Sequence, residues 1–259
     1  MVNDNKSDKI FKWLATSDPS INHQLARKKH EPTTGAWLID SDLFRKWADS
    51  EKSTLWLHGI PGAGKTVIFS TIAEHIMKLC ECERGSHYAY FYFDFNDTQK
   101  QTVNGLLRSM IIQLCVGLDT LPSAVSDLYR QFQNGQKQPE SLQLLEVLLS
   151  ILKMSDVTFL LIDALDECAE VDELCEAIKQ IVQGSERLRL FLASRTEKRI
   201  SEGLQGLVDV SIDLNGEGVD ADIRLHIHKS LETDRRSRKW PLLIKEEIET
   251  ALVDGADGM

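Results

Sequence analysis

The residues from 59 to 66 have the types and the spacing of a site that binds phosphate. They read Gly59-Ile60-Pro61-Gly62-Ala63-Gly64-Lys65-Thr66. The glycines predict a tight turn whose consecutive N–H groups point at phosphate oxygens. Lys65 would place a positive charge at the β- and γ-phosphates of a nucleotide, and the Thr66 hydroxyl would ligate Mg²⁺. This spacing, G-x-x-x-x-G-K-[ST], is that of a P-loop.

The segments on both sides of the P-loop have the composition that such a loop requires. The apolar run 55–57 predicts a strand before it, and apolar residues at helical spacing from 67 to 76 predict a helix after it. The N-terminus of that helix would add the positive end of its dipole to the phosphate site. We expect the nucleotide to contact Gly59, Pro61, Gly62, Ala63, Gly64, Lys65, Thr66 and Val67.

A second group of candidate residues follows the apolar run 157–162. The run predicts a buried parallel strand, and it ends in Asp163-Ala164-Leu165-Asp166-Glu167. Ligands of open α/β sheets bind at the carboxyl ends of the strands, so these acids should face the P-loop. We expect Asp163 to hold Mg²⁺ with Thr66, and Glu167 to orient or activate the attacking water. Asp166 is the alternative to Glu167, or its positioning partner.

A third candidate, Arg195, stands directly after the predicted strand 189–193. An arginine at the tip of a neighbouring strand can reach the γ-phosphate, because it stays charged and binds phosphate oxygens in a bidentate manner. The alternative is an ordinary surface arginine that pairs with an aspartate or a glutamate. Both interpretations stay open at the level of the sequence.

The elements that must position these residues alternate between strands and helices. This order predicts an α/β fold: a doubly wound, mostly parallel five-stranded sheet with helices on both faces. Strict apolar–polar alternation from 208 to 214 places that strand at a sheet edge. The polar and basic stretch from 20 to 35 is expected to be a connector. The strands are expected at 54–58, 88–93, 157–162, 189–193 and 208–214.

The composition excludes several classes of partner. A formal net charge of −10 argues against a nucleic acid, because binding its phosphates relies on a basic face. No apolar run is long enough to span a membrane, and the N-terminus has no apolar leader segment. The five cysteines are an odd number without zinc spacing, which favours reduced thiols. We expect a cytoplasmic location.

Three motifs together resemble the NACHT group of STAND NTPases: Gly59 to Thr66, Leu160 to Glu167, and Ala193-Ser194-Arg195. More narrowly, the chain resembles fungal NOD-like receptors whose P-loop module is also called a nephrocystin-like N-terminal domain. The resemblance extends from about residue 10 to the end at residue 259. It implies an N-terminal helix and linker (1–40), a NACHT P-loop NTPase domain (41–215) and the start of a helical subdomain (216–259).

The resemblance also implies a mechanism. Such receptors rest with a nucleoside diphosphate, exchange it for a triphosphate when a sensor region meets its ligand, and form a homo-oligomer when activated. The expected cofactors are ATP or ADP with Mg²⁺, with slow hydrolysis. The expected partners are the nucleotide and other receptor domains outside this chain. The sequence would then be either an excised NTPase module or a truncated paralogue.

Two other functions use the same residues. One is a P-loop phosphotransferase, such as a small-molecule kinase, which would need a basic lid over the acceptor. The other is a scaffold that holds nucleotide for stability without turnover. ATP is favoured over GTP, although GTP stays open; by the family resemblance, adenine would be contacted by residues 32–37.

Overall fold

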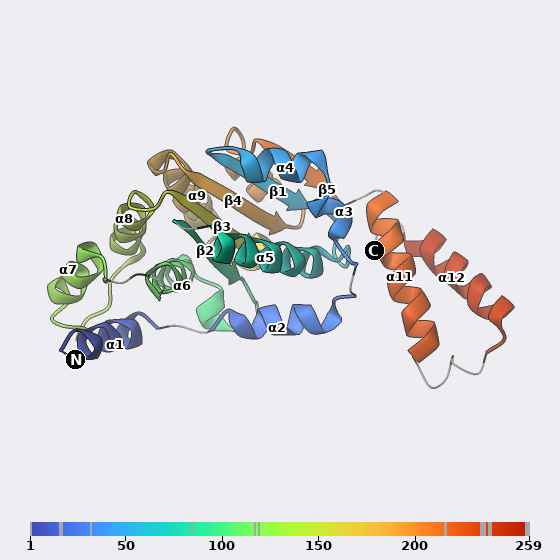
Figure 1. Ribbon diagram of the computed structural model, residues 1–259, viewed down its shortest axis with the longest axis horizontal. Coiled ribbons are helices and arrows are strands. Elements are labelled where there is room, and N and C mark those ends of the chain that lie inside the picture. The colour runs from blue at the N-terminus through green and yellow to red at the C-terminus, as the bar shows by residue number, and fades with distance from the viewer. Residues whose placement is uncertain are drawn as a thin grey trace.

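A computed structural model describes most of the chain: residues 2–15, 18–31, 33–83, 85–116, 118, 120–214, 217–233, 237 and 240–256. The described residues form one five-stranded sheet in which every neighbouring pair of strands is parallel. Its strand order is β2-β3-β4-β1-β5 (Figure 1). The predicted doubly wound α/β fold is therefore confirmed. The strands are β1 (Ser53–His58), β2 (Ser86–Tyr92), β3 (Val157–Asp163), β4 (Leu188–Ser194) and β5 (Val210–Asp213).

One face of the sheet is covered by short helices and by the long helix that follows the P-loop. Leu55 and Leu57 point to this face, where Trp47 is fully buried. The Trp47 indole packs edge-on against Phe159 and Phe191, and its Nε1 donates to the carbonyl oxygen of Leu190 at 3.1 Å. These helices are α3 (Ala36–Ile39), α4 (Asp42–Asp49) and α5 (Lys65–Cys82).

The opposite face carries a larger apolar core. Trp56, which alternates with Leu55 and Leu57 along β1, points into it. Because successive side chains of a strand point to opposite faces, the continuous apolar runs of the central strands fill both cores. The helices on this face are α1 (Val2–Leu14), α6 (Val103–Val116), α7 (Ser123–Gln131), α8 (Ser141–Leu152), α9 (Val171–Gly184) and α10 (Lys198–Gly203).

Strand β5 lies at an edge of the sheet, as the alternating pattern predicts. Its Val210 and Ile212 side chains are buried, whereas Ser211 and Asp213 are exposed. β5 pairs only with β1 among the described strands. The P-loop strand therefore lies between β4 and β5, with the acids of β3 one strand further along.

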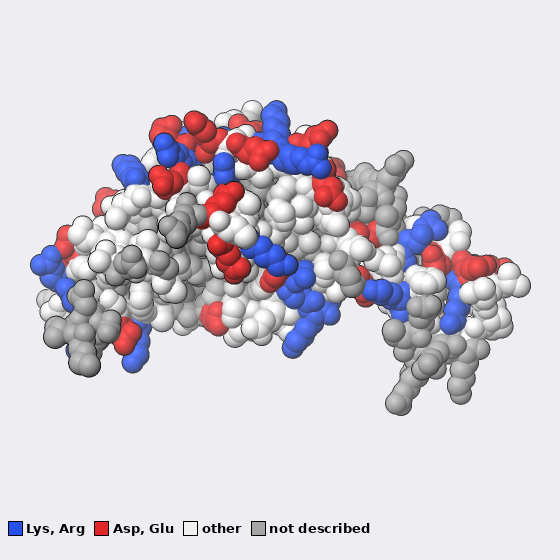
Figure 2. All heavy atoms as spheres, in the orientation of Figure 1, with Lys and Arg blue, Asp and Glu red and all other residues white. Residues whose placement is uncertain are grey.

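The expected connector at 20–35 is wrong for most of its length, because Ser20–Lys29 forms helix α2. α2 packs beside α5 at the β2 edge of the sheet (Figure 1). Its buried positions are His23 and Ala26, whereas Ile21 and Leu25 are exposed. The helical pattern was hidden because a histidine and an alanine, not large apolar residues, form the buried face. Figure 2 shows basic side chains gathered over α2, on a face where both charges are otherwise mixed.

Two helices, α11 (Glu217–Thr233) and α12 (Leu242–Ala256), pack against each other beside the sheet domain (Figure 1). The Asp222 Oδ2 atom of α11 accepts from the backbone N–H of Gly35 at 2.9 Å and from Trp37 Nε1 at 3.0 Å. Lys229 Nζ donates to Glu31 Oε2 at 2.6 Å. The helix pair is thus tied to the segment before α3. The expected domain boundary at residues 215 and 216 lies outside the described residues, as does Pro32 of the expected adenine-contact segment.

Candidate functional site

The P-loop joins the end of β1 to the start of α5. Gly62 and Gly64 have φ angles of 86° and 80°, in the left-handed region that favours glycine. Gly59 is small for a different reason: a Cβ atom at this position would lie 3.1 Å from the Leu214 Cβ atom. Ala63 is buried in the core beneath the loop. The predicted turn is thus made by Gly62 and Gly64. Gly59 instead leaves room for Leu214, the residue that follows β5.

A cavity of about 240 Å³ opens above the P-loop, at the carboxyl ends of the parallel strands. It is lined by Pro61, Gly62, Gly64, Lys65, Thr66, Val67, Asp163, Ala164, Asp166, Glu167 and Arg195. The structure therefore brings together residues from the P-loop, from the turn after β3 and from the end of β4. Of the residues expected at the site, Gly59 and Ala63 do not line this cavity.

The Lys65 ammonium group folds back on its own loop. Its Nζ atom donates to the carbonyl oxygens of Gly59 at 2.8 Å and of Ile60 at 2.7 Å. Burial lowers the pKa of Lys65, and the carboxylates of Asp166 and Asp163 oppose that shift. The charge of Lys65 is therefore close enough to Asp166 and Asp163 to be stabilised by both carboxylates.

Asp163 is the last residue of β3, and it is almost completely buried. Burial raises its pKa to about 7, while hydrogen bonds from the Thr66 side chain and from the backbone of Ala164 oppose the shift. A desolvated carboxylate beside a hydroxyl fits Mg²⁺, which protein sites often bind with one or two carboxylates and complete with substrate phosphates. The described residues contain no cluster of three or more His, Cys, Asp or Glu arranged for a metal. Phosphate oxygens and water would supply the remaining ligands.

The turn after β3 begins at Ala164, a non-glycine residue with φ of 58°. It leads into the short 3₁₀ helix η2 (Leu165–Glu167). Asp166 binds Arg195 twice: its Oδ1 accepts from the Arg195 backbone N–H at 2.8 Å, and its Oδ2 lies 3.1 Å from Arg195 Nε. The two interpretations of Arg195 are thus compatible, because the arginine pairs with an acid and also lines the cavity.

Glu167 is held by the segment that follows β2, the strand next to β3. The backbone N–H of Phe95, just after β2, donates to Glu167 Oε2 at 3.0 Å. Burial raises the pKa of Glu167, and the carboxylates of Asp166 and Asp94 add to the shift. The Phe95 N–H and Arg195 oppose it. A carboxylate with a raised pKa that lines a cavity is suited to accept a proton.

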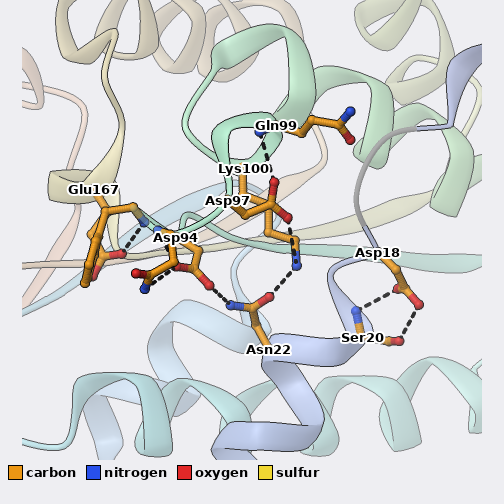
Figure 3. Close-up of polar contacts among 10 residues, drawn as sticks. Asp18, Ser20, Asn22, Asp94, Asp97, Gln99, Lys100 and Glu167 are labelled. Carbon is orange, nitrogen blue, oxygen red and sulfur yellow. Dashed lines mark hydrogen bonds and ion pairs between the residues drawn. The ribbon is translucent and has the colours of Figure 1, made fainter.

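The sequence analysis missed the contribution of the segment after β2. Asp94 accepts from Asn22 of α2 and lies beside Glu167 in Figure 3. The available signal was the one used for Asp163: the predicted strand 88–93 is followed directly by Asp94. Asn22 had no such signal, because its partner is 72 residues away in the sequence.

The five-stranded parallel sheet, the P-loop between β1 and α5, and the acids after β3 define an α/β protein with a P-loop NTPase fold. The family model described as "Nephrocystin 3, N-terminal" matches residues 33–195, which is more than half of the chain. The chain belongs to this family. It is a NACHT-like P-loop module that binds nucleotide.

Among curated proteins, the chain is similar to the vegetative incompatibility protein HET-E-1 of Podospora anserina. The two are 26% identical over 246 residues, which cover 88% of this chain and 17% of that protein. The chain thus spans a small part of its relative.

None of the described helices combines the length and the apolar character needed to cross a membrane.

The solved structures to which the chain shows some similarity include a Walker-type ATPase of Pyrococcus abyssi. It has a TM-score of 0.48 and 11% identity, over 83% of this chain and 62% of that one. The Aeropyrum pernix ORC1 protein, solved in complex with DNA, has a TM-score of 0.44 and 15% identity, over 85% of this chain and 51% of that one.

Proposed function

We propose that the chain is the nucleotide switch of an intracellular NOD-like receptor, and that it binds ATP or ADP with Mg²⁺ and hydrolyses ATP slowly. The observation that carries the proposal is the shared cavity, in which the P-loop faces Asp163, Glu167 and Arg195. A P-loop alone would indicate phosphate binding. An acid with a raised pKa and an arginine on the opposite wall supply what hydrolysis also requires.

Each side chain has one role in the proposal. When a nucleotide binds, the Lys65 ammonium group exchanges its hydrogen bonds with the carbonyl oxygens of Gly59 and Ile60 for contacts with the β- and γ-phosphates. Thr66 and Asp163 would hold Mg²⁺, which supplies charge neutralisation of the phosphates when bound. Glu167 orients the attacking water and accepts its proton. Asp166 positions Arg195 so that the guanidinium group can contact the γ-phosphate.

The receptor role rests on two supports. The first is that the chain belongs to a family of NACHT-like modules and is similar to HET-E-1, a longer protein of which it spans 17%. In addition, α11 is attached through Asp222 to the segment just before α3, and Gly35 of that segment packs beside Ile68 of α5. A change around the nucleotide could therefore reach α11 and the domains beyond it. Coupling of nucleotide exchange to oligomerisation and signalling is part of the proposal.

Turnover and binding measured on the same samples test the proposal. Wild type should bind ATP with Mg²⁺ and hydrolyse it slowly. Glu167→Gln should still bind ATP but should lose turnover, because the amide cannot accept the proton. A scaffold would bind ATP without turnover in either form, and a phosphotransferase would transfer phosphate to a small acceptor faster than to water. Either of these results would contradict the proposed switch.

A further inference from the structure

Helix α2 touches the segment that holds Glu167. Asn22 of α2 donates from Nδ2 to Asp94 Oδ2 at 2.8 Å, and its Oδ1 accepts from Lys100 Nζ. Figure 3 shows Asn22 between these two residues, with Glu167 on the far side of Asp94. Asn22 uses both ends of its amide in these contacts, so a single side chain joins α2 to both ends of the segment from 94 to 100.

Lys100 explains why this junction is specific. Its side chain is almost completely buried, and its nearest described carboxylate is that of Asp97, 3.9 Å from Nζ. A buried ammonium group is costly unless its donors are satisfied. The Asn22 oxygen supplies a close acceptor, and the Lys100 carbonyl in turn accepts from the Asp94 backbone N–H at 3.3 Å. The segment 94–100 is thus a closed loop that α2 completes.

The same loop fixes the peptide that holds Glu167. Asp94 Oδ1 accepts from the Asn96 backbone N–H at 2.9 Å, which sets the turn around Phe95. The carbonyl oxygen of Phe95 accepts from Gln101 Nε2 at 2.6 Å. With these contacts made, the Phe95 N–H points at Glu167 Oε2. The orientation of this N–H therefore depends on the contacts that Asp94 makes.

A second residue of α2 makes the test of Asn22 clean. His23 Nδ1 lies 2.8 Å from the Tyr92 hydroxyl oxygen, and His23 Nε2 lies 2.9 Å from Glu74 Oε1. Tyr92 is the last residue of β2, and Glu74 belongs to α5. These contacts hold α2 against the sheet independently of Asn22. Loss of the Asn22 amide should therefore loosen the loop without releasing the helix.

We propose that Asn22 and Asp94 are positioning residues for Glu167, and that α2 thereby controls the rate of hydrolysis. Through the loop 94–100 they orient the Phe95 N–H, which fixes one oxygen of the Glu167 carboxylate and leaves the other for the attacking water. This inference rests on the proposed function of Glu167. By this inference, a change in the position of α2 would change the position of Glu167 and thus the rate of hydrolysis.

The test compares Asn22→Ala with Leu25→Ala, a matched control at an exposed position of the same helix. Two quantities are measured on the full chain: ATP turnover, with kcat and KM separated, and hydrogen exchange of the backbone amides from 93 to 101. For Asn22→Ala we expect kcat to fall about 10- to 100-fold with an unchanged KM, because misplacement of a reacting group by about 1 Å can cost that much. Exchange from 93 to 101 should become faster. Leu25→Ala should match wild type in both measurements.

Two results would overturn the inference. One is unchanged exchange from 93 to 101 in Asn22→Ala, because the loop would then not depend on α2. The other is faster exchange with an unchanged kcat, because Glu167 would then not depend on the loop. A wild-type chain that binds ATP but does not hydrolyse it would contradict the proposed function instead, and the exchange measurement would still decide whether Asn22 holds the loop.

Discussion

Asp166 and Arg195 form a two-point contact that joins the turn after β3 to the end of β4. The carboxylate accepts from the arginine backbone N–H at 2.8 Å and lies 3.1 Å from its Nε. The Asp166 side chain is 5% exposed, whereas that of Arg195 is 47% exposed. The acid is therefore fixed, whereas Arg195 is half-exposed and lines the cavity. This arrangement suits an arginine whose backbone N–H and Nε are held by Asp166 while its remaining guanidinium N–H groups contact a ligand.

Replacement of Arg195 should separate hydrolysis from binding. Arg195→Ala should lower the turnover of ATP by about 10²-fold, which is the typical cost of losing one group that stabilises the transition state. Its affinity for ADP should stay near that of wild type, because the γ-phosphate is absent from ADP. Arg199→Ala, which removes an exposed arginine paired with Asp172, is the control. Equal losses of ATP and ADP affinity would show that Arg195 has a structural role instead.

Asp222→Ala should release the helix pair α11 and α12 from the segment before α3. The change leaves the Gly35 N–H and the Trp37 indole without their shared acceptor. We expect limited proteolysis to cut residues 217–256 about tenfold faster, since loss of about 1.4 kcal/mol of local stability changes an opening equilibrium by that factor. Arg224→Ala, at an exposed position of α11, is the control. An unchanged cleavage rate would mean that Asp222 does not hold the pair.

The contribution of His75 to stability should fall as the pH falls below the ordinary histidine pKa. Burial lowers the pKa of His75 from its ordinary value of 6.5, Lys78 lowers it further, and Asp40 opposes both. Between pH 6.5 and the lower folded-state pKa, this residue binds more protons in the unfolded chain, so its contribution to the free energy of unfolding decreases with decreasing pH. The pKa values of His30 and His58 are lowered as well, with the same sign.

Urea unfolding at several values between pH 7.5 and pH 5 measures this slope. Between pH 7.5 and pH 5, the unfolding free energy of wild type should change by a more negative amount than that of His75→Gln. The same substitution at His87, which lies at the start of β2, is the control. A slope that His75→Gln leaves unchanged would contradict the role assigned to burial of this histidine.

The sheet and the walls of the cavity could be predicted because their signals are local. Continuous apolar runs marked the buried strands, and strict alternation marked β5 at the edge. The carboxyl ends of parallel strands meet at one side of a sheet, so the sequence was enough to place Asp163, Glu167 and Arg195 near the P-loop. Those inferences needed only pattern and topology.

Contacts between distant segments could not be predicted in this way. The buried face of α2 consists of His23 and Ala26, and a polar contact with Tyr92 and Glu74 takes the place of an apolar stripe. The reason for Gly59 depends on Leu214, more than a hundred residues later. Such contacts join residues that are far apart in the sequence. Neither residue of such a pair carries a local pattern that identifies its partner.

The central claim is that Lys65 and its loop bind the phosphates of a nucleotide, and titration calorimetry with ATP and Mg²⁺ tests it most directly. Wild type should bind. Lys65→Ala should bind about 10- to 100-fold more weakly or not at all, because charged hydrogen bonds contribute about 1.5–3 kcal/mol. Lys46→Ala, at an exposed position of α4, should bind like wild type. If Lys65→Ala binds ATP as tightly as wild type does, the account of the site is contradicted.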